Sequence, residues 1–119
     1  MKLDAFRRTM ESYRRAVDEE AKSLKDSYVA LDKLHALYRR FDLEERAMAD
    51  QVMAEWALSD NEGVRFDALA LIDDFNIPAA TSALRTLVGR LELSTAPGAP
   101  YELQKVNRIL QKLANMHVS

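Results

Sequence analysis

The sequence predicts an all-α protein of about six helices arranged in three antiparallel hairpins. Apolar residues recur at intervals of three and four along most of the chain, which is the period of an α-helix. The 119 residues contain 3 glycines and 3 prolines, and every one except Gly89 falls where a predicted helix begins or ends. No stretch alternates β-branched and polar residues, so the sequence predicts no sheet.

The first forty residues are predicted to form two helices. Apolar residues follow the helical period over residues 3–17 and again over residues 28–41. A spacing of seven residues between apolar positions across both segments also fits one long coiled-coil helix. Because the polar residues Glu20 and Ser27 occupy the companion apolar positions of that pattern, we favour a break within residues 23–26.

A third helix is predicted over residues 43–56. Asp42 and Glu45 have the spacing of a capping box, in which each side chain accepts a hydrogen bond from the other residue's backbone N–H. Three large apolar residues share this helix, and packing in the core is the favoured interpretation over a flexible binding patch. They are Met48, Met53 and Trp56.

A fourth helix is predicted to begin after Ser59 or Asp60 and to end near Phe75. Apolar residues surround it on nearly every side, Phe66 among them. A helix with so little polar surface is usually buried. We therefore expect this helix at the centre of the fold.

The last two helices are predicted on either side of a loop at residues 97–100. Pro78 lies in the first turn of the fifth helix, where its missing N–H costs nothing. Gly89 lies inside that helix, where it costs about 1 kcal/mol relative to alanine or marks a close contact between helices. Tyr101 begins the sixth helix, either as an exposed binding anchor or as a side chain that holds this helix against the fifth.

The segment from Ser59 to Ile72 is similar to the turn and second helix of a HEAT repeat. That pattern has an Asp in the turn, Val-Arg at the helix start, and Ala and Leu on the packed side, here Asp60, Val64, Arg65, Ala68 and Leu71. The resemblance is best over residues 42–75. It implies that Asp60 caps the helix and that Arg65 pairs with acidic groups of neighbouring turns. It also implies a small HEAT-like solenoid, with a compact helical bundle as the alternative, and a role in binding other macromolecules.

The residue inventory argues against catalysis. The chain has no cysteine and 2 histidines, which excludes disulfides, thiolate nucleophiles and metal centres built from cysteine or from several histidines. Asp32 and His35 have the spacing of one element of a di-iron helical site, but Ala114 stands where His117 would need an acidic residue. We therefore expect a protein that is not an enzyme and that binds no metal and no cofactor.

The charged residues are distributed unevenly along the chain. The formal net charge is −2, yet residues 42–77 carry ten Asp and Glu against two Lys and Arg. In consecutive hairpins alternate loops share an edge, so the acids near the loops at Asp42 and Asn76 are expected on one edge. Helix N-termini favour acidic residues, but acids near a helix C-terminus, such as Asp73 and Asp74, need another explanation. The candidate partner-binding residues are Asp42, Glu44, Glu45, Asp73 and Asp74.

These features favour a protein-binding module whose acidic edge attracts a basic partner protein. An immunity protein or antitoxin that masks a cationic nuclease toxin has this physical type. One alternative is contact with nucleic acid through the first helix, although Glu11 and Asp18 are placed to pair with its arginines. Those arginines are Arg7, Arg8, Arg14 and Arg15. Another alternative is a self-associating bundle with Phe6 and Tyr13 in the seam.

The sequence predicts no signal peptide and no membrane-spanning segment. Residues 1–4 lack the apolar core of a signal peptide. The longest apolar run, residues 68–72, is far shorter than the roughly 20 residues that span a bilayer. We expect one helical domain over residues 1–119, located in the cytoplasm and not inserted in a membrane.

Overall fold

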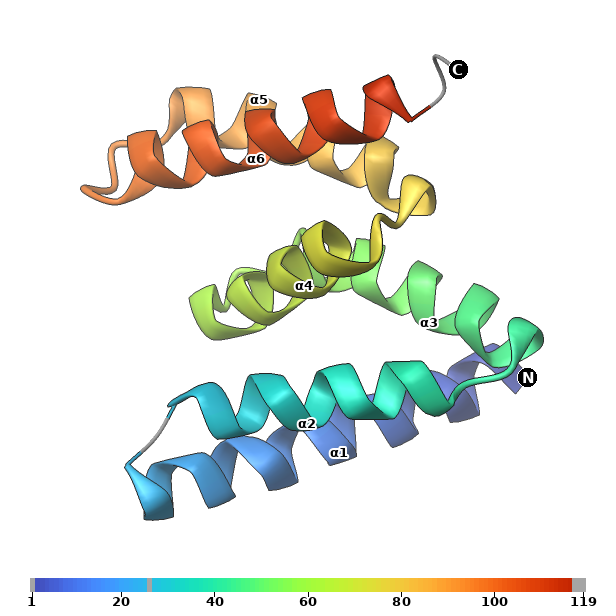
Figure 1. The fold of residues 1–119 in the computed structure, drawn as a ribbon. Helices are drawn as coiled ribbons and strands as arrows, with labels where there is room; N and C mark the ends of the chain where they lie inside the picture. Colours follow the sequence, from blue (N-terminus) through green and yellow to red (C-terminus); the bar gives the residue numbers. More distant parts are fainter. Residues whose placement is uncertain (1, 26, 117–119) are drawn as a thin grey trace. The chain divides into compact units, whose positions relative to one another are not determined.

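The computed structural model describes residues 2–25 and 27–116, and these residues form six α-helices, one short 3₁₀ helix and no strand (Figure 1). The all-α fold class and the number of helices are thus confirmed for the described residues. The elements are α1 (Lys2–Leu24), α2 (Ser27–Arg40), α3 (Leu43–Trp56), α4 (Glu62–Phe75), η1 (Pro78–Ala80), α5 (Thr81–Leu93) and α6 (Ala99–Asn115).

The chain divides into two compact units, Met1–Val52 and Met53–Ser119, with the division inside α3. Each unit has buried apolar side chains of its own. The two units are described in turn.

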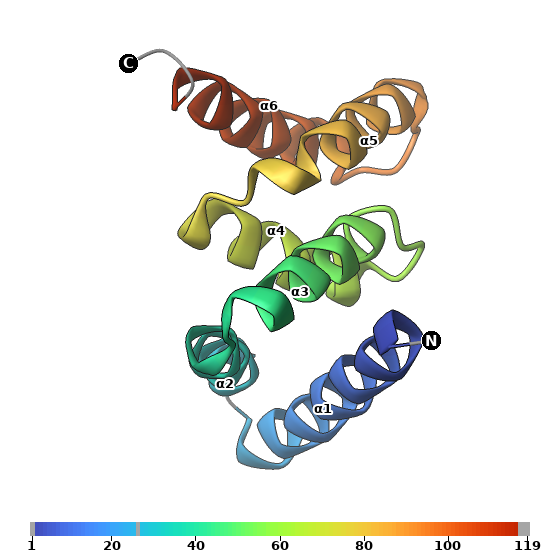
Figure 2. The ribbon, with the colours of Figure 1, turned by 90° about the vertical axis from the view of Figure 1, so that its right-hand side faces the viewer.

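In the first unit α1 and α2 form an antiparallel pair joined by a short connection (Figure 1, Figure 2). The predicted break is confirmed, because α1 ends at Leu24 and Lys25 has a left-handed φ of 56°. Asp26 lies outside the described residues. Apolar side chains at the helical period bury one face of each helix, among them Met10, Val17, Leu34 and Tyr38.

The start of α3 has the predicted capping box. The backbone N–H of Asp42 donates to Glu45 Oε1 over 3.0 Å, and the backbone N–H of Glu45 donates to Asp42 Oδ1 over 2.8 Å. Further along the helix Met53 and Trp56 are buried, which confirms core packing for these two residues. Met48 is half-buried.

In the second unit α4 begins one residue later than the HEAT resemblance implies. Asn61, not Asp60, is the N-cap residue, and its side chain accepts a hydrogen bond from the Val64 backbone N–H. Both residue types are good N-caps, so composition alone does not choose between neighbours. Asn76 ends the helix in the left-handed conformation with φ 52°.

The expectation that α4 is buried on nearly all sides is wrong at Phe66. Its side chain is 54% exposed, whereas Leu69, Leu71 and Ile72 are buried. The apolar pattern of the sequence does not distinguish this exposed side chain from the buried ones.

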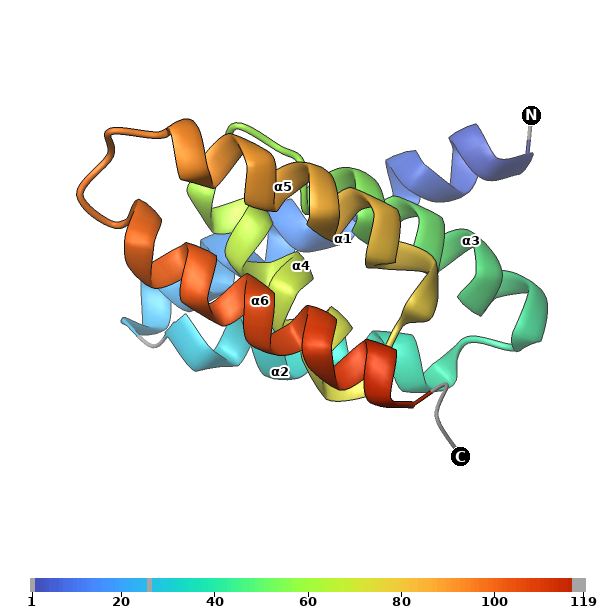
Figure 3. The ribbon, with the colours of Figure 1, turned by 90° about the horizontal axis from the view of Figure 1, so that it is seen from above.

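Helices α5 and α6 pack side by side as an antiparallel pair (Figure 3). Pro78 begins the 3₁₀ helix η1, and α5 follows at Thr81. Gly89 is exposed, and a Cβ added there would meet nothing within 4 Å. The interpretation of Gly89 as a close helix contact is therefore wrong.

Helix α6 also contacts α4, and the two helices run in the same direction (Figure 1). Both helices contribute buried apolar side chains to the core. These are Leu69 and Ile72 from α4 and Val106, Ile109 and Leu113 from α6.

Candidate binding surfaces

The first group of predicted site residues lies where α3 begins, within the first unit. We call residues Asp42, Leu43, Glu44 and Glu45 the acidic turn. Asp42 and Glu45 use one carboxylate oxygen each in the capping box. Glu44 forms an ion pair with Lys2, but the two side chains are 65% and 70% exposed. Such a surface pair contributes little to stability, so Glu44 can exchange this partner for another at small cost.

The acidic turn also presents an apolar side chain to solvent. Leu43 is 86% exposed at the first position of α3. The helical period groups it with the other apolar residues of α3, such as the buried Val52, but Leu43 itself lies at the very start of the helix and is not buried. The turn therefore combines one exposed leucine with three carboxylates.

The second group of predicted site residues, Asp73 and Asp74, lies near the end of α4 in the second unit. Asp73 pairs with Lys112 and, over 3.5 Å, with Arg108, and its side chain is only 23% exposed. Two cations of α6 thus offset the unfavourable position of this carboxylate near a helix C-terminus. Asp74 is exposed. Pairing within the second unit therefore accounts for the position of Asp73 near a helix C-terminus.

The arginines of α1 are partly used within their own helix. Arg7 pairs with Asp4 over 2.6 Å, and Arg15 contacts the Ser12 hydroxyl over 3.5 Å. Asp18, expected to pair with the arginines, pairs with Lys22 over 3.4 Å.

The predicted self-association seam is largely occupied inside the first unit. Phe6 packs against Phe41 with 5.1 Å between ring centroids, and the Tyr13 hydroxyl donates to the Lys33 carbonyl over 3.4 Å. Both side chains are half-buried. They contribute to the packing of α1 against its own unit.

A polar cluster lies between α2 and α3 in the first unit. The Tyr38 hydroxyl donates to Asp50 Oδ1 over 2.6 Å, and the Arg46 guanidinium lies 5.4 Å from the centroid of the Tyr38 ring. Burial raises the pKa of Asp50, and burial together with the hydrogen bond to Asp50 raises the pKa of Tyr38. The cluster joins the two helices through groups that are costly to bury unpaired.

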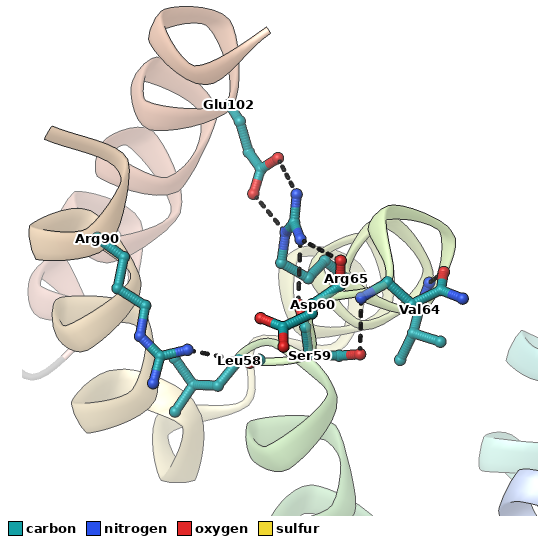
Figure 4. A network of polar contacts seen from close by, with 8 residues as sticks. Leu58, Ser59, Asp60, Val64, Arg65, Arg90 and Glu102 are labelled. Atoms are coloured by element: carbon teal, nitrogen blue, oxygen red, sulfur yellow. Dashed lines mark hydrogen bonds and ion pairs between the residues drawn. The ribbon is translucent and has the colours of Figure 1, made fainter. Parts of the chain in front are cut away.

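In the second unit Arg65 connects the turn before α4 to the start of α6 (Figure 4). Its Nε donates to Glu102 Oε2 over 2.9 Å and its Nη2 donates to Glu102 Oε1 over 3.1 Å. Nη1 donates to the Ser59 carbonyl over 3.0 Å. The hydrogen bond to Glu102 raises the pKa of Arg65. The resemblance implies that Arg65 pairs with acidic groups of neighbouring turns, and its acidic partner in the structure is Glu102, in the first turn of α6.

A groove lies between α4 and α6 beside this ion pair, with a volume of about 410 Å³. We call it the aromatic groove, because Phe66 and Tyr101 line it. These two residues are 54% and 79% exposed. Lys105 Nζ lies 4.8 Å from the centroid of the Phe66 ring. The lining residues are Glu62, Gly63, Phe66, Leu69, Gly98, Tyr101, Glu102 and Lys105.

Of the two interpretations of Tyr101, exposure favours the binding anchor. A tyrosine that held α6 against α5 would bury its ring, and this ring is 79% exposed. The partner of Tyr101 across the groove, Phe66, was missed from the sequence. In the sequence Phe66 directly follows Arg65. The side chain of Arg65 contacts Glu102 of α6, so Phe66 lies close to the same helix.

Comparisons with known proteins add no family assignment. No protein-family model, curated protein or solved structure matches this chain. Within residues 2–25 and 27–116, no helix combines the length and the apolar character needed to cross a membrane. The same residues contain no cluster of three or more His, Cys, Asp or Glu able to hold a metal ion. His117 lies outside the described residues.

Proposed function

We propose that this chain is a non-catalytic protein-binding module whose acidic side chains attract a basic partner protein. The proposed contact residues are Asp42, Glu44 and Glu45 in the first unit and, separately, Asp73 and Asp74 in the second. The observation that carries the proposal is the acidic turn, where three carboxylates surround an exposed leucine. Carboxylates around an apolar side chain combine electrostatic steering with the burial of apolar surface on binding.

The uneven charge distribution supports the same proposal. Residues 42–77 carry ten acidic and two basic residues. One of those two cations, Arg65, is already paired with Glu102. This leaves a strong excess of negative charge, which accelerates association with a cationic protein at low ionic strength.

The proposal includes a HEAT-like arrangement of the second unit. In a helical repeat, the second helices of successive hairpins run in the same direction and contact each other at corresponding positions. Two ion pairs between α4 and α6 follow this rule, Arg65 with Glu102 and Asp73 with Lys112. They join residues 37 and 39 positions apart. This separation is close to the period of about 40 residues that HEAT repeats have.

Among basic partners, a cationic nuclease fits best. An enzyme that cleaves nucleic acid has a positive surface, and a small acidic protein that covers this surface inhibits it without catalysis of its own. The chain would then act as an immunity protein or antitoxin.

The test is a charge reversal at Glu44, because this residue takes no part in the capping box. Immobilised wild-type chain should retain a basic protein from an extract of the native host, and Glu44→Lys should retain at least about tenfold less. Glu92→Lys is the matched control, since it makes the same charge change at an exposed position of α5. Equal retention by Glu44→Lys and Glu92→Lys, or capture of an acidic partner, would remove the acidic turn from the proposal.

A further inference from the structure

The aromatic groove has the composition of a site for an apolar side chain. Exposed aromatic side chains on a concave surface are typical of binding hot spots. Phe66 and Tyr101 form its two sides from different helices, and the buried Leu69 also lines it. The volume of about 410 Å³ exceeds that of one leucine or phenylalanine side chain, so the groove can accept an anchor residue and part of its neighbours.

One end of the groove is positively charged. Tyr101, Lys105 and Arg108 follow the helical period along one face of α6. Arg108 is 70% exposed, so its 3.5 Å pair with Asp73 is solvated and can be exchanged for another carboxylate at small cost. A second hollow next to the groove is lined by Phe66, Tyr101, Gln104, Lys105 and Arg108. Two carboxylates also line the groove, Glu62 and Glu102, and Glu102 is paired with Arg65. A segment that fits this surface has an apolar side chain followed by carboxylates.

This chain contains such a segment, the acidic turn. Seven large apolar side chains of the described residues are strongly exposed. Only Leu43 among them has an acidic residue on each side, Asp42 and Glu44. With 86% of its surface exposed, Leu43 needs no rearrangement of α3 to enter a groove on another molecule.

We infer that the aromatic groove binds the acidic turn of a second copy of this chain. Leu43 of one copy lies between Phe66 and Tyr101 of the other, and its flanking carboxylates face Lys105 and Arg108. The two complementary surfaces are different, so the contact is heterologous unless two copies exchange it reciprocally. The inference does not depend on the proposed basic partner. If both hold, self-association and partner binding exclude each other, because both use Glu44.

The test is the association state of the intact chain measured by sedimentation equilibrium between about 10 μM and about 1 mM, the range of weak, transient interfaces. The wild-type chain should associate as its concentration rises. Leu43→Ser and Tyr101→Ser should each weaken association at least about tenfold, because each removes an anchor at the centre of the contact. Both side chains are exposed, so circular dichroism should show unchanged helix content. Leu93→Ser is the matched control, since Leu93 is 87% exposed but has an acidic neighbour, Glu92, on one side only.

A mixing experiment distinguishes this contact from general stickiness. Leu43→Ser keeps an intact groove and Tyr101→Ser keeps an intact acidic turn, so an equimolar mixture should form dimers of one of each and nothing larger. A wild-type chain that remains monomeric at about 1 mM would overturn the inference. So would a mixture that associates no better than either variant alone, or a Leu93→Ser variant as defective as Leu43→Ser.

Discussion

Arg65 and Glu102 form a two-pronged ion pair between the first turn of α4 and the first turn of α6. Two parallel hydrogen bonds of 2.9 and 3.1 Å join the guanidinium to the carboxylate. Their side chains are only 16% and 21% exposed, which separates this pair from the solvated pairs elsewhere on the chain. It is the polar contact that best defines how the helices of the second unit pack.

Arg65→Ala should therefore lower the free energy of unfolding by about 2 kcal/mol, since it leaves Glu102 and the Ser59 carbonyl without their charged donor. Arg65→Lys should recover little of this, because an ammonium group cannot form both bonds of the fork. Urea denaturation followed by circular dichroism measures the difference. The control is Lys22→Ala, whose exposed pairs with Asp18 and Glu19 predict no measurable change. Equal effects of Arg65→Ala and Lys22→Ala would contradict the assigned role.

The capping box at the start of α3 should contribute measurably to stability. Asp42→Ala removes the acceptor for the Glu45 backbone N–H and should lower the free energy of unfolding by about 1 kcal/mol. Asp42→Ser should retain most of it, because serine also caps helices well. Glu44→Ala is the adjacent control, outside the box. A loss with Glu44→Ala as large as that with Asp42→Ala would show that bulk charge and not capping is responsible.

Gly89 offers a stabilising substitution. It lies within α5 without positive φ, and a Cβ at this position would meet nothing within 4 Å. Gly89→Ala should therefore raise the free energy of unfolding by about 1 kcal/mol. Gly98→Ala is the informative comparison, because that site is also open but Gly98 is the N-cap of α6, where alanine is disfavoured. A gain at both positions, or at neither, would contradict this explanation.

Asp50 should make stability depend on pH in the opposite direction from most carboxylates. Burial raises the pKa of Asp50 above the ordinary value of 3.8, so the folded chain holds this proton more tightly than the unfolded chain. Its contribution to stability is fully present below pH 3.8 and decreases as the pH rises through the higher pKa of the folded state. Asp50→Asn keeps an acceptor for Tyr38 and should remove this decrease. Urea denaturation of both proteins from about pH 3 to about pH 7 measures it, and parallel profiles would contradict the prediction.

Local features of the fold could be predicted from the sequence, and features that depend on distant partners could not. The capping box of Asp42 and Glu45 and the break after Leu24 each depend on neighbouring residues, and both are confirmed. The shift of the N-cap from Asp60 to Asn61 is a choice between two adjacent residues of similar capping strength.

The candidate surfaces were harder to predict because they depend on which face of a helix remains uncovered. The apolar pattern assigns Phe66 to the core as readily as Leu69, yet Leu69 is buried and Phe66 is 54% exposed. The pairing of Asp73 with Lys112 joins residues 39 positions apart, which helical periodicity does not encode. The sequence alone therefore does not reveal that two cations of α6 pair with Asp73.

The ion pairs at the two ends of α4 and α6 affect the association rate of a ligand that binds in the aromatic groove. Sliding one helix along the other by a single turn, about 5.4 Å, would break Arg65–Glu102 and Asp73–Lys112 together. The positions of α4 and α6 along each other, and with them the two sides of the aromatic groove, are therefore fixed before a ligand binds. Binding of a ligand therefore requires no rearrangement of the helices, and its association rate should be set by diffusion and orientation. Substitutions in the groove should change mainly the dissociation rate.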